Sequence, residues 1–166
     1  MILGLTLTMF TVLHTVIGVV GIITGLVVAG GLAAGKRFEP WALVFLVTTI
    51  ATSLTGFAFP FVRFLPSHAV GVVSLIVLAV VIVAQYVMHF AGAWRPIYAV
   101  GVVLATYLNT FVLVTQLFRR LPALIVSAPT QSEPPFTITQ ALTFLVFARL
   151  AAAAVKGFRA DPAGMP

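Results

Sequence analysis

The sequence HAVGVVSLIVLAVVIVAQYVMHFAG, residues 68–92, contains no Lys, Arg, Asp or Glu. An uncharged apolar run of more than about 18 residues is typical of a helix that crosses a membrane. The run follows Pro66 and Ser67, and a serine is a favourable residue immediately before the first turn of a helix. This stretch therefore predicts a transmembrane helix, from which the rest of the chain can be interpreted.

Four further apolar stretches occur in the chain, two before this run and two after it. Prolines, tryptophans and basic residues separate them, as expected for the ends of membrane helices. Together with 68–92, the predicted spans are about 5–34, 41–61, 97–118 and 137–155. The proline-rich stretch 121–136 is a predicted loop. A single transmembrane domain, 1–157, followed by a short polar tail, 158–166, then accounts for the chain.

The stretch 137–155 has two interpretations because it contains Gln140 and Arg149. Arg149 shares its helix face with Leu142 and Leu145, so there is no separate polar face of the kind that a helix lying on the membrane surface needs. A fifth span, with Arg149 extending toward the far interface, is therefore favoured. The predicted fold class is an all-α, polytopic transmembrane helix bundle with five spans, or with four spans and one interfacial helix.

The composition excludes a water-soluble domain of this size. Of the 166 residues, 61% are apolar and 7% are charged, whereas about a quarter of a soluble domain is charged. Nine Lys and Arg against three Asp and Glu give a net charge of +6, but the basic residues sit singly or in pairs at the ends of the apolar runs. We therefore expect the lipid bilayer, and not nucleic acid, as their partner. Cysteine is absent, which excludes disulfides and thiolate chemistry.

The distribution of basic residues predicts an orientation. With five spans, one side of the membrane holds Lys36, Arg37, Arg95, Lys156 and Arg159, and the other holds Arg63, Arg119 and Arg120. The positive-inside rule then places the C-terminus in the cytoplasm and the N-terminus outside. With four spans, both termini are cytoplasmic.

Small and polar residues form a stripe along the first span. Its members are spaced three or four residues apart: Thr11, His14, Gly18, Gly21 and Gly25. Small residues let two membrane helices approach closely. Packing of Gly18, Gly21 and Gly25 against a helix of the same chain is favoured over dimerisation through the GxxxG motif at 21–25, which is a weak signal.

A redox cofactor is an alternative, with His14 and His68 as its candidate ligands. Some helix bundles hold haem between histidines on facing helices. The first and third spans run in the same direction, and the two histidines reach similar depths only if the first span begins near Val12. The sequence thus allows a membrane electron carrier that binds haem b or quinone, without indicating one.

Polar side chains inside the spans are candidates for lining a solute path, because each would leave polar atoms unsatisfied if it faced lipid. These candidates are Thr52, Gln85, His89, Asn109 and Gln116. A buried amide such as Asn109 more often bonds to a neighbouring helix than to a ligand. No carboxylate lies inside a span, which argues against a proton-coupled pump acting alone.

The second half of the chain resembles a known group of membrane proteins. The stretch Leu108-Asn109-Thr110-Phe111-Val112-Leu113-Val114-Thr115-Gln116-Leu117-Phe118 and the loop Thr130-Gln131-Ser132-Glu133-Pro134-Pro135-Phe136 are similar to those of small multi-pass inner-membrane proteins of bacteria. The resemblance implies a bacterial inner-membrane location and carries over no catalytic residue.

The function expected from these observations is that of a small, non-enzymatic integral membrane protein. Catalytic templates such as HExxH, a nucleophile elbow or paired carboxylates do not occur in the sequence, and no metal site is predicted. The chain is then an accessory subunit of a membrane complex or a homo-oligomer. The alternatives are the haem b or quinone carrier and a small-solute channel or transporter.

Overall fold

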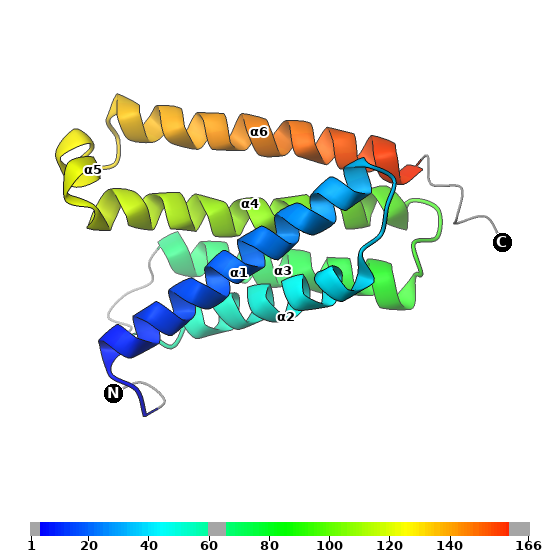
Figure 1. The fold of residues 1–166 in the computed structure, drawn as a ribbon, viewed down its shortest axis with the longest axis horizontal. Coiled ribbons are helices and arrows are strands. Elements are labelled where there is room, and N and C mark those ends of the chain that lie inside the picture. The colour runs from blue at the N-terminus through cyan, green and yellow to red at the C-terminus, as the bar shows by residue number, and fades with distance from the viewer. Residues whose placement is uncertain (1–3, 60–65, 160–166) are drawn as a thin grey trace.

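A computed structural model describes residues 4–59 and 66–159, which form a bundle of helices with no β-strand among them. In chain order the elements are α1 (Leu7–Ala33), α2 (Glu39–Gly56), α3 (Pro66–Ile82), the π-helical turn η1 (Val83–Val87), α4 (Trp94–Arg120), α5 (Pro122–Ser127) and α6 (Pro134–Arg159). The long helices alternate in direction along the bundle (Figure 1). The predicted all-α bundle is confirmed.

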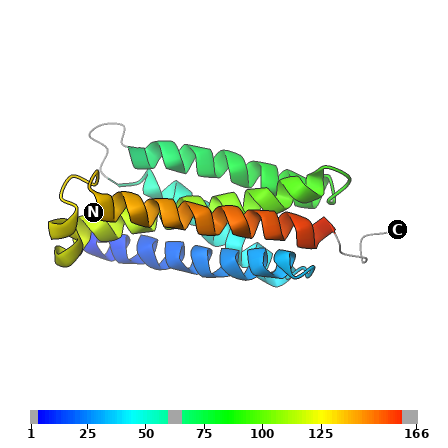
Figure 2. The same cartoon turned by 90° about the horizontal axis from the view of Figure 1, so that it is seen from above.

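The central helix of the bundle is α4, which packs against α1, α3 and α6. α2 packs against both α1 and α3, and α1 also contacts α6. Figure 2 shows α1 and α3 at opposite edges of the bundle. The core lies where these helices meet. Its most buried large side chains are each at most 2% exposed and include Phe45, Leu78, Val81, Val102 and Val103.

Apolar side chains cover the outside of the bundle and several polar ones are buried inside it. Val47 and Ile76 are each 59% exposed, whereas Thr49 and Thr106 are fully buried. This distribution fits a chain whose solvent is lipid, because polar groups then need partners inside the protein. Four helical segments, α1, His68–Val87, α4 and α6, are long and apolar enough to cross a membrane. The chain therefore has the architecture of an integral membrane protein.

Four of the five predicted spans coincide with these four segments. α6 is 26 residues long and includes all of 137–155, and it packs along α4 as one helix of the bundle. α2, with 18 residues, is not among the four. Its first residue is Glu39 and its second half is rich in threonine, and both features lower its hydropathy. α2 nevertheless lies antiparallel to α1 inside the bundle (Figure 1).

The prediction that the third span continues to Gly92 is wrong. The helix ends at Val87, after the wider turn of η1. His89 and Phe90 then adopt φ values of 46° and 61°, and this left-handed backbone cannot continue a right-handed helix. The reversal lets the Phe90 ring pack edge-on against Tyr98, with ring centroids 4.9 Å apart.

Two shorter regions also differ from the prediction. The predicted loop 121–136 contains the short helix α5, which Pro122 opens because proline fits the first helical turn. The polar tail was predicted to begin at residue 158, but α6 continues to Arg159 and buries Phe158 to 2% exposure. The rest of that tail, 160–166, lies outside the described residues.

Candidate functional site

One end of the bundle gathers the elements that form the candidate site. There, the ends of α1, η1 and α6 meet the beginnings of α2 and α4 (Figure 1). We call this the basic end, because it carries Lys36, Arg37, Arg95, Lys156 and Arg159. The opposite end holds Arg119 and Arg120 in the last turn of α4, while Arg63 lies outside the described residues.

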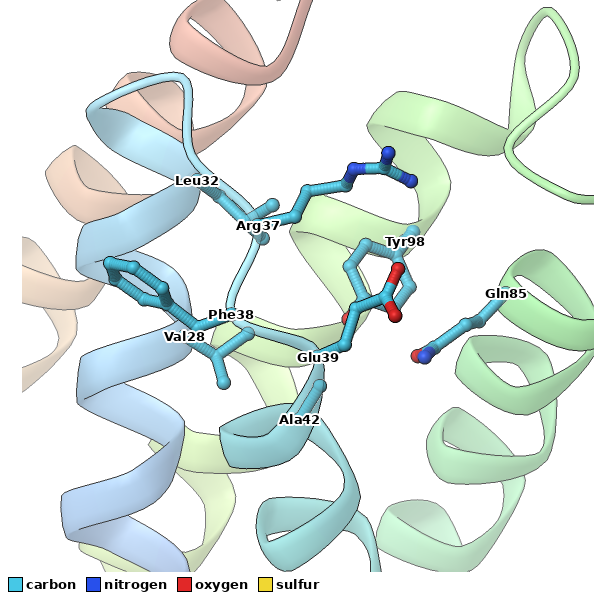
Figure 3. A pocket seen from close by; sticks show the side chains of 8 residues that line it. All are labelled: Val28, Leu32, Arg37, Phe38, Glu39, Ala42, Gln85 and Tyr98. Carbon is cyan, nitrogen blue, oxygen red and sulfur yellow. The ribbon is translucent and has the colours of Figure 1, made fainter. Parts of the chain in front are cut away.

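A small pocket lies at the basic end (Figure 3). Its lining comes from α1, the loop after it, α2, η1 and α4, namely Val28, Leu32, Arg37, Phe38, Glu39, Ala42, Gln85 and Tyr98. The cavity is about 10 Å³, which is close to the smallest space that holds one water-sized group. Apolar side chains from α1 and α2 form one wall, so that the polar groups concentrate on the remaining sides.

The floor of the pocket has a buried acceptor that lacks a donor. Gln85 Oε1 is buried and has no hydrogen-bond partner within the described residues. The Tyr98 side chain beside it is only 4% exposed. Leaving a buried acceptor unpaired costs about 1–3 kcal/mol. A group that brings a donor into this pocket would recover that free energy.

The mouth of the pocket carries charged groups of both signs. Arg37 and Glu39 are exposed, and they come from the loop between α1 and α2 and from the first residue of α2. The Arg37 guanidinium lies over the Phe90 ring, 5.5 Å from its centroid. Such cation–π contacts are worth about 0.5–1 kcal/mol at exposed sites. Arg37 is thereby held at the rim, above Tyr98 (Figure 3).

A second guanidinium is held in the same way. Arg95 lies over the Phe158 ring, 5.7 Å from its centroid, and Phe158 packs against Phe90 with centroids 5.4 Å apart. The two rings are therefore a joined aromatic platform that fixes both arginines at one end of the bundle. Sequence analysis missed this platform because Phe158 is far in the chain from both Phe90 and Arg95.

The local backbone explains how Gln85 comes to lie on this pocket. Gln85 is the middle residue of η1, and a π-helical turn shifts the register of the side chains relative to the α-helix before it. Such turns, and non-glycine residues with positive φ such as His89 and Phe90, recur at functional sites. The apolar, uncharged sequence around Gln85 gave no signal of either feature.

The glycine stripe of α1 packs inside the chain. A Cβ atom on Gly18 would lie 3.3 Å from Thr52 Cγ2, and one on Gly21 would lie 3.0 Å from Thr49 Oγ1 and 3.3 Å from Asn109 Nδ2. The stripe thus faces α2 and α4. Thr49 Oγ1 and Asn109 Nδ2 have no hydrogen-bond partner within the described residues.

The other candidates for a solute path are scattered along the bundle. His89 lies beyond the helix, exposed, with Nδ1 3.1 Å from the Val87 carbonyl oxygen. Gln116 accepts a hydrogen bond from Arg120 Nε at 3.3 Å, near the end opposite the pocket. Thr52 donates to the Thr48 carbonyl at 2.8 Å. These three residues and Asn109, near the middle of α4, therefore lie at different depths along the bundle.

The two candidate haem ligands lie at the same end of the bundle, opposite the pocket, but on helices that do not face each other. His14 Nδ1 is 2.8 Å from Thr55 Oγ1, and the His14 ring packs edge-on against Phe59. His68 is 6% exposed and stacks on Phe57. α1 and α3 occupy opposite edges of the bundle (Figure 2), so the arrangement does not place the imidazoles on facing helices.

Sequence analysis also missed the interhelical role of Gln140. Its Nε2 donates to the Phe111 carbonyl at 3.2 Å and to Thr115 Oγ1 at 3.1 Å, which ties α6 to α4. Groups of three or more His, Cys, Asp or Glu that could hold a metal ion do not occur within the described residues. No protein-family model, curated protein or solved structure matches this chain.

Proposed function

We propose that this chain is a non-enzymatic accessory subunit of a membrane complex, in the bacterial inner membrane, and that the outer face of α6 binds a membrane helix of a different subunit. The observation that carries the proposal is an exposed stripe on α6, with members three or four residues apart. Ile138, Leu142 and Leu145 are 56%, 58% and 56% exposed, and Arg149, also exposed, continues the stripe.

The depth of Arg149 makes this stripe unusual for a surface that only meets lipid. At a rise of 1.5 Å per residue, Arg149 lies about 15 Å before the end of α6 at Arg159. An arginine at the centre of a membrane helix costs about 2.5–3.5 kcal/mol. Lys156 and Arg159 in the last turn already anchor α6 at the interface. A carboxylate from a neighbouring helix would remove most of the cost of Arg149.

The carboxylate would come from another kind of chain. Of the three acidic residues, Glu39 begins α2, Glu133 precedes α6, and Asp161 lies outside the described residues. None of them lies inside a predicted span. A second copy docked symmetrically on this stripe would place Arg149 beside its own equivalent, which is repulsive. The stripe therefore favours an accessory subunit over a homo-oligomer.

Site-specific photo-crosslinking in native membranes tests the proposal. A photoreactive residue at Leu145, on the stripe, should give a protein adduct, and the same residue at Ile76 of α3, which is similarly exposed, should not. Arg149→Leu should reduce the Leu145 adduct several-fold. An adduct of two 17.6 kDa chains would show self-association instead. Equal adducts at both positions, or no effect of Arg149→Leu, would refute the proposed interface.

We further propose that the basic end faces the cytoplasm, because it carries the larger number of basic residues. The absence of cysteine permits a direct test with an impermeant thiol reagent. Ala34→Cys, after α1, should be labelled only from the cytoplasmic side, and Ser132→Cys, before α6, only from the opposite side. The reverse pattern would invert the proposed topology.

A further inference from the structure

We propose that the pocket at the basic end binds a primary ammonium group joined to a phosphodiester, which is the chemistry of the phosphoethanolamine headgroup of a membrane lipid. This goes beyond the proposed subunit contact and uses a different surface, since the stripe on α6 contributes nothing to the pocket. Three features of the pocket carry the inference: its acceptors, its size and its position.

The acceptors define the charge and hydrogen-bonding capacity of the ligand. Gln85 Oε1 is buried without a donor, and the Glu39 carboxylate points into the gap between Gln85 and Tyr98 (Figure 3). A carboxylate accepts hydrogen bonds and offers none. A group that bonds at once to Gln85 Oε1 and to the Glu39 carboxylate must bring at least two hydrogen-bond donors. A positive charge on that group would also match the negative charge of Glu39.

The size of the cavity selects among cationic groups. Its space of about 10 Å³ admits one group the size of a water molecule. A primary ammonium has this size and carries three N–H donors. A quaternary trimethylammonium is larger and has no N–H donor, so it fits the cavity less well and cannot satisfy Gln85. The Tyr98 ring on the floor adds a face that attracts a cation.

The position of the pocket supplies the second part of the ligand. The pocket lies where α1 ends and α2 begins, at the level where membrane helices reach the headgroups. The Arg37 guanidinium at the rim, held over Phe90, presents planar donors that suit phosphate oxygens. A phosphate linked to an ammonium in the cavity would extend toward the rim, which carries this guanidinium. A lipid headgroup therefore meets both halves of the site at once.

Lipid retention by the intact chain, measured by native mass spectrometry, tests this inference. Phosphatidylethanolamine, its mono- and dimethylated forms and phosphatidylcholine with the same acyl chains are offered in equal amounts. Phosphatidylethanolamine should be retained at least about fivefold over phosphatidylcholine, and retention should fall stepwise as N–H donors are replaced by methyl groups. Equal retention of the four lipids would overturn the proposal and leave the cavity as a site for water.

Paired variants assign the selectivity to this pocket. Glu39→Gln, at an exposed position, and Gln85→Leu should each bring the ratio of retained phosphatidylethanolamine to retained phosphatidylcholine close to one. Glu133→Gln and Gln116→Leu make the same chemical changes near the other end of the bundle and should preserve it. If the ratio survives both pocket variants, the site is elsewhere and the inference fails. Because Glu39 is exposed, Glu39→Gln decides the question even if Gln85→Leu does not fold.

The same headgroup chemistry could come from a membrane lipid or from a free phosphoethanolamine in solution. A competition experiment distinguishes these two sources. Soluble phosphoethanolamine should leave the lipid in place if the acyl chains contribute to binding, which identifies the ligand as a membrane lipid. Displacement of the lipid at millimolar concentration would keep the chemistry of the site and identify a free solute as its ligand.

Discussion

Substitution of Gly25 by alanine should destabilise the bundle by about 1–3 kcal/mol, the usual cost of forcing one extra carbon into a packed core. The added Cβ would lie 2.9 Å from Phe45 Cε2 and 2.9 Å from Thr106 Cγ2, and closer still to Thr106 Oγ1. Phe45 and Thr106 are both fully buried, and Thr106 is further held by its 2.8 Å hydrogen bond to the Val102 carbonyl. Neither neighbour can move aside without disturbing the core.

Gly30→Ala in the same helix is the matched control, because a Cβ there would meet nothing within 4 Å. Both substitutions gain the same helix propensity, about 0.5–1 kcal/mol, so the difference between them isolates the steric cost at Gly25. Unfolding in mixed micelles, followed by tryptophan fluorescence, measures that difference. Thr106→Ala should restore much of the stability lost in Gly25→Ala. Equal stability of the Gly25→Ala and Gly30→Ala proteins would refute this account of the stripe.

Three further predictions concern other contacts of the bundle. Gly157→Ala should destabilise the bundle more than Gly25→Ala, because the new Cβ would collide with backbone carbonyls in the last turn of α1, which cannot rotate away. The same unfolding assay compares the two variants, and a smaller loss of stability in Gly157→Ala would contradict this prediction. Gln140→Leu should cost less than about 1 kcal/mol, since the lost hydrogen bonds to α4 are offset by removal of an unpartnered Oε1. At Glu133, desolvation raises the pKa of the carboxyl, but hydrogen bonds from the Thr130 side chain and from the backbone of Glu133, Thr130 and Ser132 together outweigh it and lower the pKa below its ordinary value. The turn at Thr130 should therefore be fully stabilised above the ordinary glutamate pKa and lose this stabilisation as the pH falls through the lowered value. The protection of the Thr130 amide, its exchange rate relative to the intrinsic rate at the same pH, measures this, and protection that rises on acidification would contradict it.

The sequence by itself determined the fold class and the solvent of this protein. Long runs without charge, such as 68–92, can satisfy their backbone in lipid only as helices, and prolines and basic residues at their ends set the approximate boundaries. The spacing of Gly18, Gly21 and Gly25 also indicated one closely packed face, because helical periodicity alone places them together. These are local properties, so neighbouring residues in the chain suffice to predict them.

The pairing of the helices, and hence the candidate site, was decided only by the tertiary structure. The pocket joins Glu39, Gln85 and Tyr98, which belong to three elements and show no shared motif in the sequence. The end of the third helix at Val87 also depended on a distant contact, because the reversal at Phe90 lets its ring pack against Phe158, almost 70 residues away. No local propensity predicts such contacts, since their free energy exists only once the helices have assembled.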